Sequence, residues 1–99
     1  MEGEQVKRED LERAWECRQH EREIAEKAMV VDDINESMYY FGQLQEEESR
    51  TFNVLSEITK DCPGGEITAH VIRQVLDLIG VYTISRFIEV LKVLGVEAV

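Results

Sequence analysis

A fifteen-residue pattern occurs twice in succession within the last third of this sequence. Residues 67–81 are followed directly by residues 82–96, and Thr68, Leu76 and Gly80 each have a counterpart fifteen positions later. Each copy opens with a threonine that can cap a helix and closes with a glycine that can end one. The pattern therefore predicts two short consecutive helices, joined as an apolar helical hairpin over residues 67–96.

The spacing of the polar residues in each copy distinguishes helix from strand. Both copies are rich in valine and isoleucine, whose branched side chains also favour strands. Polar residues, however, occupy positions 70, 73, 74 and 77 in the first copy and positions 85, 86, 89 and 92 in the second. Steps of three and four residues follow the helical period, so we expect helices near 68–79 and 83–94 and no sheet.

Two longer helices are predicted before the repeat, near residues 5–31 and 34–60. The first has a thin apolar stripe within a dense run of charges, which is typical of a partly exposed helix. Asp33 begins a capping-box pattern that starts the second. The apolar residues of the second helix recur at three- and four-residue steps: Ile34, Met38, Phe41, Leu44, Phe52, Leu55 and Ile58. Gln45 and Glu48 interrupt this stripe, so we expect a bend there or a projection beyond the core.

These elements predict an all-α fold in a single domain over residues 1–99, in which an acidic helix (1–31) and a long helix (34–60) precede the apolar hairpin. Hydrophobic residues make up 43% of the chain, which is more than a disordered segment would contain. The core is expected where the hairpin meets the second long helix. Its predicted members are Phe87, Leu91, Leu94, Ile72, Val75, Leu76 and Ile79 from the hairpin, with Phe52, Leu55 and Ile58 from the long helix.

The charge of the chain limits its partners and its location. It contains 21 acidic residues and 11 lysines and arginines, for a formal net charge of −10. Such a charge disfavours nonspecific attraction to nucleic acids and to anionic membranes. The acidic first residues lack the apolar run of a signal peptide, and no stretch approaches the roughly 20 apolar residues of a membrane span. The two cysteines resemble intracellular thiols, so we expect a cytoplasmic protein that does not contact a membrane.

Four side chains are candidates for metal ligands. Cys17 and His20 lie one helical turn apart, and Cys62 and His70 could complete a Cys₂His₂ set if the loop after residue 60 folded back on the first helix. Their spacing matches no compact zinc module, so a metal-binding helical bundle is only the second alternative function. The sequence shows no nucleophile–base pair and no glycine-rich phosphate loop. We therefore expect neither an enzyme nor a bound cofactor.

The hairpin also has the residue spacing of a DNA-binding helix-turn-helix over residues 70–94. Leu76 stands where such a unit keeps a small residue, and Arg86 and Glu89 stand where it buries apolar ones. Its recognition helix would have only Arg86 and Lys92 to contact DNA phosphates. A DNA-binding regulator with a degenerate helix-turn-helix, or an acidic decoy of basic nucleic-acid-binding proteins, is therefore the first alternative function, and nucleic acid is not the expected partner.

Association with protein is the function that the residue pattern favours. Each repeat helix has one narrow polar stripe, so a single packing partner would leave much of its apolar surface uncovered. A two-fold homodimer, or another homo-oligomer, would bury that surface. The residues expected at this interface are Val71, Leu78, Tyr82, Ile84, Val90 and Val93. The sequence thus predicts a small, acidic, non-enzymatic interaction module (an adaptor, an assembly factor or a small regulatory subunit) that associates through its hairpin.

Overall fold

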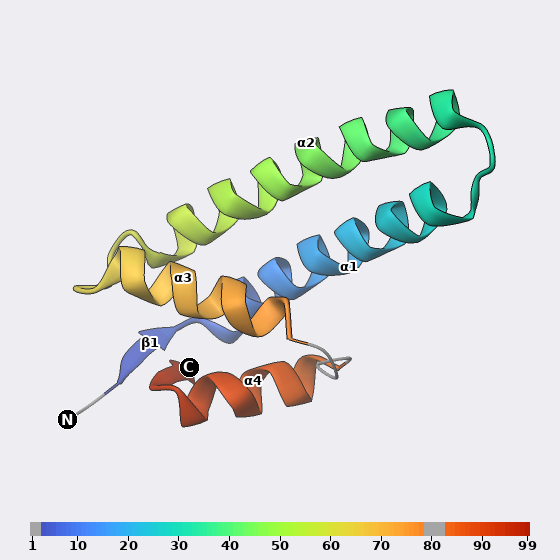
Figure 1. The fold of residues 1–99 in the computed structure, drawn as a ribbon. Coiled ribbons are helices and arrows are strands. Elements are labelled where there is room, and N and C mark those ends of the chain that lie inside the picture. The colour runs from blue at the N-terminus through green and yellow to red at the C-terminus, as the bar shows by residue number, and fades with distance from the viewer. Residues whose placement is uncertain (1–2, 79–82) are drawn as a thin grey trace.

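Helices dominate the part of the chain that the computed structural model describes, which comprises residues 3–78 and 83–99. The elements of this part follow in the order β1 (Glu4–Val6), α1 (Arg8–Val30), α2 (Ile34–Thr59), α3 (Gly65–Leu76), α4 (Ile84–Val93) and β2 (Val96–Ala98). Figure 1 shows α1 and α2 as a long antiparallel hairpin, with α3 and α4 packed at one end of it. The all-α fold, with two long helices before a short pair, is confirmed.

Local capping signals set several of the helix ends. Asp33 accepts hydrogen bonds from backbone N–H groups in the first turn of α2, the nearer at 2.7 Å, so α2 begins at the predicted residue. Thr83 caps α4 in the same way, because its hydroxyl accepts a hydrogen bond from the N–H of Arg86 at 3.2 Å. Gly95 has a φ of 89°, the left-handed conformation that glycine adopts just after a helix.

The third helix, α3, differs from the prediction at both ends. It begins at Gly65, three residues before the threonine that was expected to cap it, and it ends at Leu76. The carbonyl oxygen of Leu76 accepts hydrogen bonds from the side chains of Arg18 and Arg22 on α1, both at 3.3 Å. These contacts come from a distant part of the chain, so the local pattern could not reveal them. The predicted terminator Gly80 lies outside the described residues.

A small parallel sheet joins the two ends of the described chain, so the prediction of no sheet was wrong. The strand β1 pairs with β2 in a register that places Glu4 beside Val96 and Val6 beside Ala98. Val6 and Val96 are both buried in the core. Each strand has only three residues, which is too short for the alternation that signals a strand in sequence. The glutamate and glutamine of β1 are also depleted in strands and favour helices.

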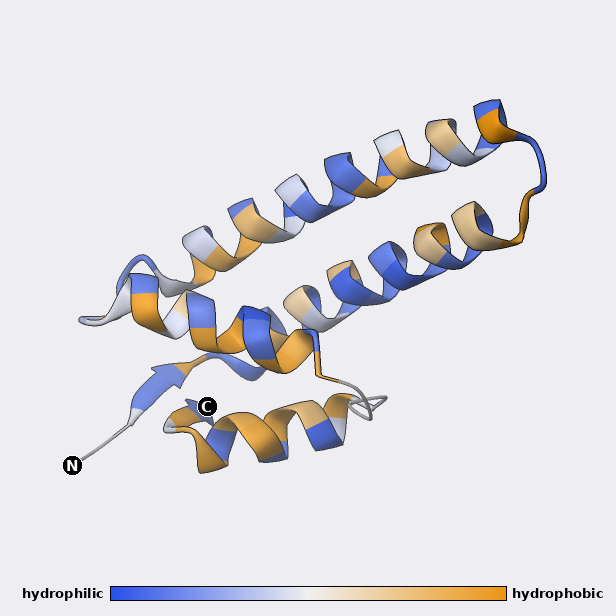
Figure 2. Cartoon of the chain, in the orientation of Figure 1, coloured by the Kyte–Doolittle hydropathy of each residue, from blue (hydrophilic) through white to orange (hydrophobic). Residues whose placement is uncertain are grey.

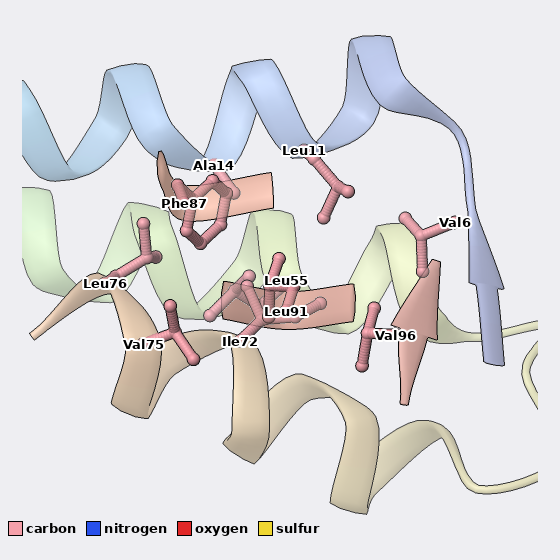
Figure 3. Packing of buried hydrophobic residues seen from close by; sticks show 10 residues of the cluster. All are labelled: Val6, Leu11, Ala14, Leu55, Ile72, Val75, Leu76, Phe87, Leu91 and Val96. Atoms are coloured by element: carbon pink, nitrogen blue, oxygen red, sulfur yellow. The ribbon is translucent and has the colours of Figure 1, made fainter. Parts of the chain in front are cut away.

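The core lies where the base of the α1–α2 hairpin meets α3, α4 and the sheet. Figure 3 shows the cluster of buried residues, which consists of Val6, Leu11, Ala14, Leu55, Ile72, Val75, Leu76, Phe87, Leu91 and Val96. Phe87 and Leu91 were expected to pack with the apolar side of α3, and this is confirmed. Leu94 and Phe52 were also placed in the core by the sequence, but both are more than half exposed. Ile79 lies outside the described residues.

The far part of the α1–α2 hairpin extends well beyond this core. We call residues 22–50 the arm; Ala28 is the only one of them that is buried. The molecule measures 52 × 24 × 19 Å, and its long dimension follows the arm. Figure 2 shows that α3 and α4 are largely apolar, whereas the arm mixes apolar and strongly polar positions along its whole length. The sequence predicted a bend or a projection of one or two turns, whereas the part of α2 before residue 51 projects over its whole length.

Candidate functional site

A buried carboxylate lies where the arm joins the core. Glu21 on α1 is completely buried, and its side chain accepts hydrogen bonds from three others. Arg73 on α3 donates two of them, from Nη1 to Oε2 at 2.9 Å and from Nη2 to Oε1 at 2.8 Å. Arg18 donates from Nη1 to Oε1 at 3.1 Å, and the hydroxyl of Thr51 on α2 donates to Oε2. One carboxylate therefore ties three helices together through charge-assisted hydrogen bonds.

The protonation of Glu21 reflects this set of donors. Burial by itself would raise the pKa of the Glu21 carboxyl, because a low-dielectric environment disfavours the charged form. The hydrogen bonds from Arg73 and Thr51, together with the positive charges of Arg73 and Arg18, outweigh burial and hold the pKa below its ordinary value. The same pairing raises the pKa of Arg73. Both groups are therefore charged at neutral pH.

The lowered pKa of Glu21 predicts a loss of stability in acid. Because the folded-state pKa lies below the unfolded value of about 4.3, the contribution of Glu21 is complete above that pH and disappears as the pH falls through the folded-state pKa. We therefore expect the free energy of unfolding to fall below about pH 4.3, and to fall less steeply in Glu21→Gln. Urea unfolding followed by circular dichroism between pH 2 and 7 measures both slopes. Equal slopes in the two proteins would contradict this assignment.

The burial of Glu21 also determines what this network can do. A carboxylate with no exposed surface, whose oxygens are already occupied by three donors, is not positioned to meet a substrate. Its geometry instead fixes the direction in which the arm leaves the core, because α1, α2 and α3 all contribute to it. The network therefore supports the arm, and the candidate site lies on the arm itself.

The arm exposes an apolar face on α2. We call this the outward face, and it consists of Ile34, Met38, Phe41, Gln45, Glu48 and Phe52. These residues follow one another at steps of four and three, the spacing of a coiled-coil seam. Its four large apolar side chains are 50–70% exposed. The sequence placed them, together with Leu44, on the core side of the helix, whereas α2 faces α1 with the side that holds Thr51, whose hydroxyl donates to Glu21.

A groove between α2 and α3 lies at the inner end of the outward face. It has a volume of about 500 Å³, and both Glu48 and Phe52 line it. The other lining residues are Leu55 and Ser56 of α2 with Glu66, Ala69, His70 and Arg73 of α3. The next residues at the same spacing along α2, Leu55 and Thr59, are buried. The outward face therefore runs along the arm and stops where α3 begins to cover α2.

The hairpin residues that the sequence assigned to an interface lie in different environments. Val71, Ile84 and Val90 are half-buried and pack against the core. Val93 is 82% exposed on α4, and Leu78 is exposed just after α3. Tyr82 lies outside the described residues. The structure thus leaves Leu78 and Val93 as the accessible members of the predicted set, whereas the outward face of α2 exposes four large apolar side chains on one helix.

The four candidate metal ligands are not brought together. Residues 3–78 and 83–99 contain no group of three or more histidine, cysteine, aspartate or glutamate side chains arranged to hold a metal ion. His20 and His70 are exposed, and Cys17 and Cys62 are half-buried free thiols. Burial raises the pKa of both thiols, and nearby carboxylates raise it further. Both cysteines are therefore protonated at neutral pH and are poor nucleophiles.

The helix-turn-helix interpretation of the hairpin remains a prediction. Arg86 is exposed, but it pairs with Glu89 on the same helix, with Nη1 3.2 Å from Oε2. Lys92 is exposed near the end of α4. The turn that such a unit requires falls on residues 79–82, which lie outside the described part of the chain. The described surface of α4 thus offers few cations to a phosphate backbone.

Two features of this region escaped the sequence analysis. The steps of four and three residues along α2 are visible in the sequence, but an apolar stripe does not reveal which side of the helix the other helices cover. The pairing of Glu21 with Arg73 gave no signal, because the two residues are far apart in sequence and stand among many other charges. A glutamate inside an otherwise apolar pattern would have been noticed, whereas α1 is charged throughout.

Comparison with known proteins adds no relative from which a function could be carried over. No family model matches the chain, and neither a curated protein nor a solved structure matches it. None of the helices within residues 3–78 and 83–99 combines the length and the hydrophobicity needed to cross a membrane. The function of this chain is therefore inferred from its own surface.

Proposed function

We propose that this chain is a non-enzymatic protein–protein interaction module that binds a helix of a protein partner along the outward face of α2. The observation that carries the proposal is the exposure of Ile34, Met38, Phe41 and Phe52 in one line on a projecting arm. Apolar side chains exposed singly are common on soluble proteins, but four large ones on one face of a helix favour binding, even though Gln45 and Glu48 separate Phe41 from Phe52. Phenylalanine and methionine are also enriched at protein interfaces.

The shape of the surface favours a helical partner. A seam with steps of four and three residues matches the spacing of side chains along a second helix packed at a shallow angle. At its inner end the groove between α2 and α3 adds a concave apolar surface beside Phe52, as in proteins that accept an amphipathic helix. The Glu21 network joins α1, α2 and α3 at the base of the arm, next to the inner end of the face.

Photo-crosslinking tests this proposal. A photoreactive phenylalanine analogue replaces Phe41 on the outward face, and the same analogue at Glu46, which is exposed on another side of α2, serves as the matched control. We expect a protein adduct from position 41 in the cells of origin and none from position 46. A second substitution, Met38→Glu, should abolish the adduct, and mass spectrometry of the joined peptides should identify the residues involved.

The result that would overturn the proposal is equally specific. Equal adducts from positions 41 and 46, or none from position 41, would show that the outward face does not bind protein. An adduct that persists in the Met38→Glu variant would show that the contact lies elsewhere on the arm.

A further inference from the structure

A glycine that the single chain does not require lies beside the outward face of α2. Gly42 lies inside a helix, where glycine lowers stability relative to alanine. A Cβ added at this position would meet no other atom within 4 Å, and the backbone does not have a positive φ. Neither crowding nor backbone conformation within one chain therefore explains the glycine. A close approach from outside the chain would explain it.

Gly42 belongs to a row of small uncharged residues beside the outward face. Asn35, Gly42 and Ser49 are spaced by seven residues, and all three are exposed. They border the outward face on the side opposite α1, because on the other side Thr51 is buried and Leu44 is half-buried. The row itself therefore has no long or charged side chain, and the exposed residues Tyr39 and Glu46 flank it on the side away from the outward face.

The position of Gly42 indicates which partner fits. The accessible part of the outward face runs from Ile34 to Phe52, and its midpoint falls beside Gly42. We propose that the outward face binds the same face of a second copy of this chain, antiparallel, with the two-fold axis passing beside Gly42. This inference rests on the proposed function, because it names the partner that occupies the same face.

The residues of the outward face are self-complementary in this arrangement. Antiparallel pairing about the midpoint places Ile34 opposite Phe52 of the other copy, Met38 opposite Glu48, and Phe41 opposite Gln45. Each large apolar residue thus meets an apolar group or the aliphatic stem of a polar side chain. All six residues of the face are used in both copies, and no part of α3 is displaced, because the pairing stops at Phe52.

Each chain has a net charge of −10, and the proposed pairing keeps the charges of the face itself apart. Glu48 is the only charged residue of the outward face and its small border. In the proposed pairing the two copies of Glu48 lie on opposite sides of the axis, roughly 15 Å apart along the helices at 1.5 Å per residue. This separation exceeds the Debye length of about 8–10 Å at moderate salt. Glu47 lies on another side of α2, and Glu46 lies just beyond the small border, one helical turn from Gly42.

The area of the face is at the lower end of what specific dimers bury. Large side chains bury roughly 150–250 Å² each. Because four of them are at least half exposed here, and the stems of Gln45 and Glu48 add to them, each copy would bury on the order of 500 Å². Two copies together would bury about 1,000 Å², which is the lower limit for specific interfaces. A dimer of moderate affinity is therefore expected.

Cysteine crosslinking tests the position of the axis. Gly42→Cys is prepared in a chain that also carries Cys17→Ser and Cys62→Ser, and Glu46→Cys in the same background is the matched control. Two residues beside a two-fold axis face each other, so mild oxidation should convert most of the Gly42→Cys protein to a covalent dimer and leave the control largely monomeric. Equal crosslinking of the two variants, or none at position 42, would overturn the proposal.

Solution mass provides a second measurement. The wild type should have twice the 11.5 kDa of one chain and a thermal midpoint that rises with protein concentration. Phe41→Glu and Gly42→Gln should weaken the dimer by about a hundredfold or more, while Gly42→Gln keeps full helical circular dichroism because glutamine favours helices. Val93→Glu, at an exposed apolar residue of α4, should leave the dimer intact.

Failure of this inference can be distinguished from failure of the proposed function. A monomeric wild type, with an adduct to a different protein from position 41, would overturn the second copy as partner and leave the outward face as a binding surface. A dimer that is broken by Val93→Glu but not by Phe41→Glu would overturn the proposed pairing. It would place the contact on the hairpin instead.

Discussion

Replacing Arg73 with methionine is expected to lower the free energy of unfolding by about 3–5 kcal/mol. Arg73 donates two hydrogen bonds to the buried carboxylate of Glu21. Its removal leaves a buried charge that keeps Arg18 and Thr51 as hydrogen-bond donors but loses its two shortest bonds to an arginine, and an incompletely paired buried charge is strongly destabilising. Urea unfolding at pH 7, followed by circular dichroism at 222 nm, measures the change.

Two comparisons make this prediction specific to the buried pair. Arg86→Met removes an arginine whose ion pair with Glu89 is more than half exposed on both sides, and such pairs contribute at most about 1 kcal/mol. The double variant Glu21→Met with Arg73→Met should recover most of the lost stability, because it leaves no unpaired charge. If Arg73→Met cost no more than Arg86→Met, the carboxylate would have to be solvated and not buried.

Replacing Phe87 with alanine is expected to lower the free energy of unfolding by about 3–5 kcal/mol. Phe87 on α4 is completely buried and belongs to the same cluster as Leu11 and Ala14 of α1 and Val75 and Leu76 of α3. Truncation therefore removes a large apolar side chain and leaves a cavity at the meeting point of three helices. The same unfolding experiment measures the loss.

Phe52→Ala is the matched control for Phe87→Ala, because the chemical change is identical and only the environment differs. Phe52 is 69% exposed on the outward face, so its truncation should change the stability of the single chain by less than about 0.5 kcal/mol. The measurement belongs at a protein concentration low enough for the wild type to be monomeric. Comparable losses from the two variants would mean that α2 is rotated relative to the described fold.

The parts of the fold that the sequence predicted correctly are those governed by neighbours along the chain. Asp33, Thr83 and Gly95 each act within one helical turn, and each performs the predicted capping role. The apolar spacing of α3 and α4 likewise places Ile72, Phe87 and Leu91 in the core as expected. Local hydrogen bonding and periodicity are sufficient for such assignments because their partners lie only a few residues away.

The parts that the sequence did not predict depend on distant segments. The three-residue strand β1 exists only because β2 pairs with it. Phe52 and Leu55 are three residues apart on one helix, yet Leu55 is buried and Phe52 is exposed, because α3 covers α2 only beyond that point. The packing of the next helix decides which side of an apolar stripe becomes core. The stripe itself does not contain this information.

The pairing of β1 with β2 also has a consequence for the order in which the chain folds. The α1–α2 hairpin is made of segments adjacent in sequence, so closing it costs little chain entropy and we expect it to form early. Val6 cannot be covered until residues 96–98 have been synthesised, since its strand partner lies there. During synthesis the nascent chain therefore exposes an unfinished core edge after the α1–α2 hairpin has been made, and the core is completed last.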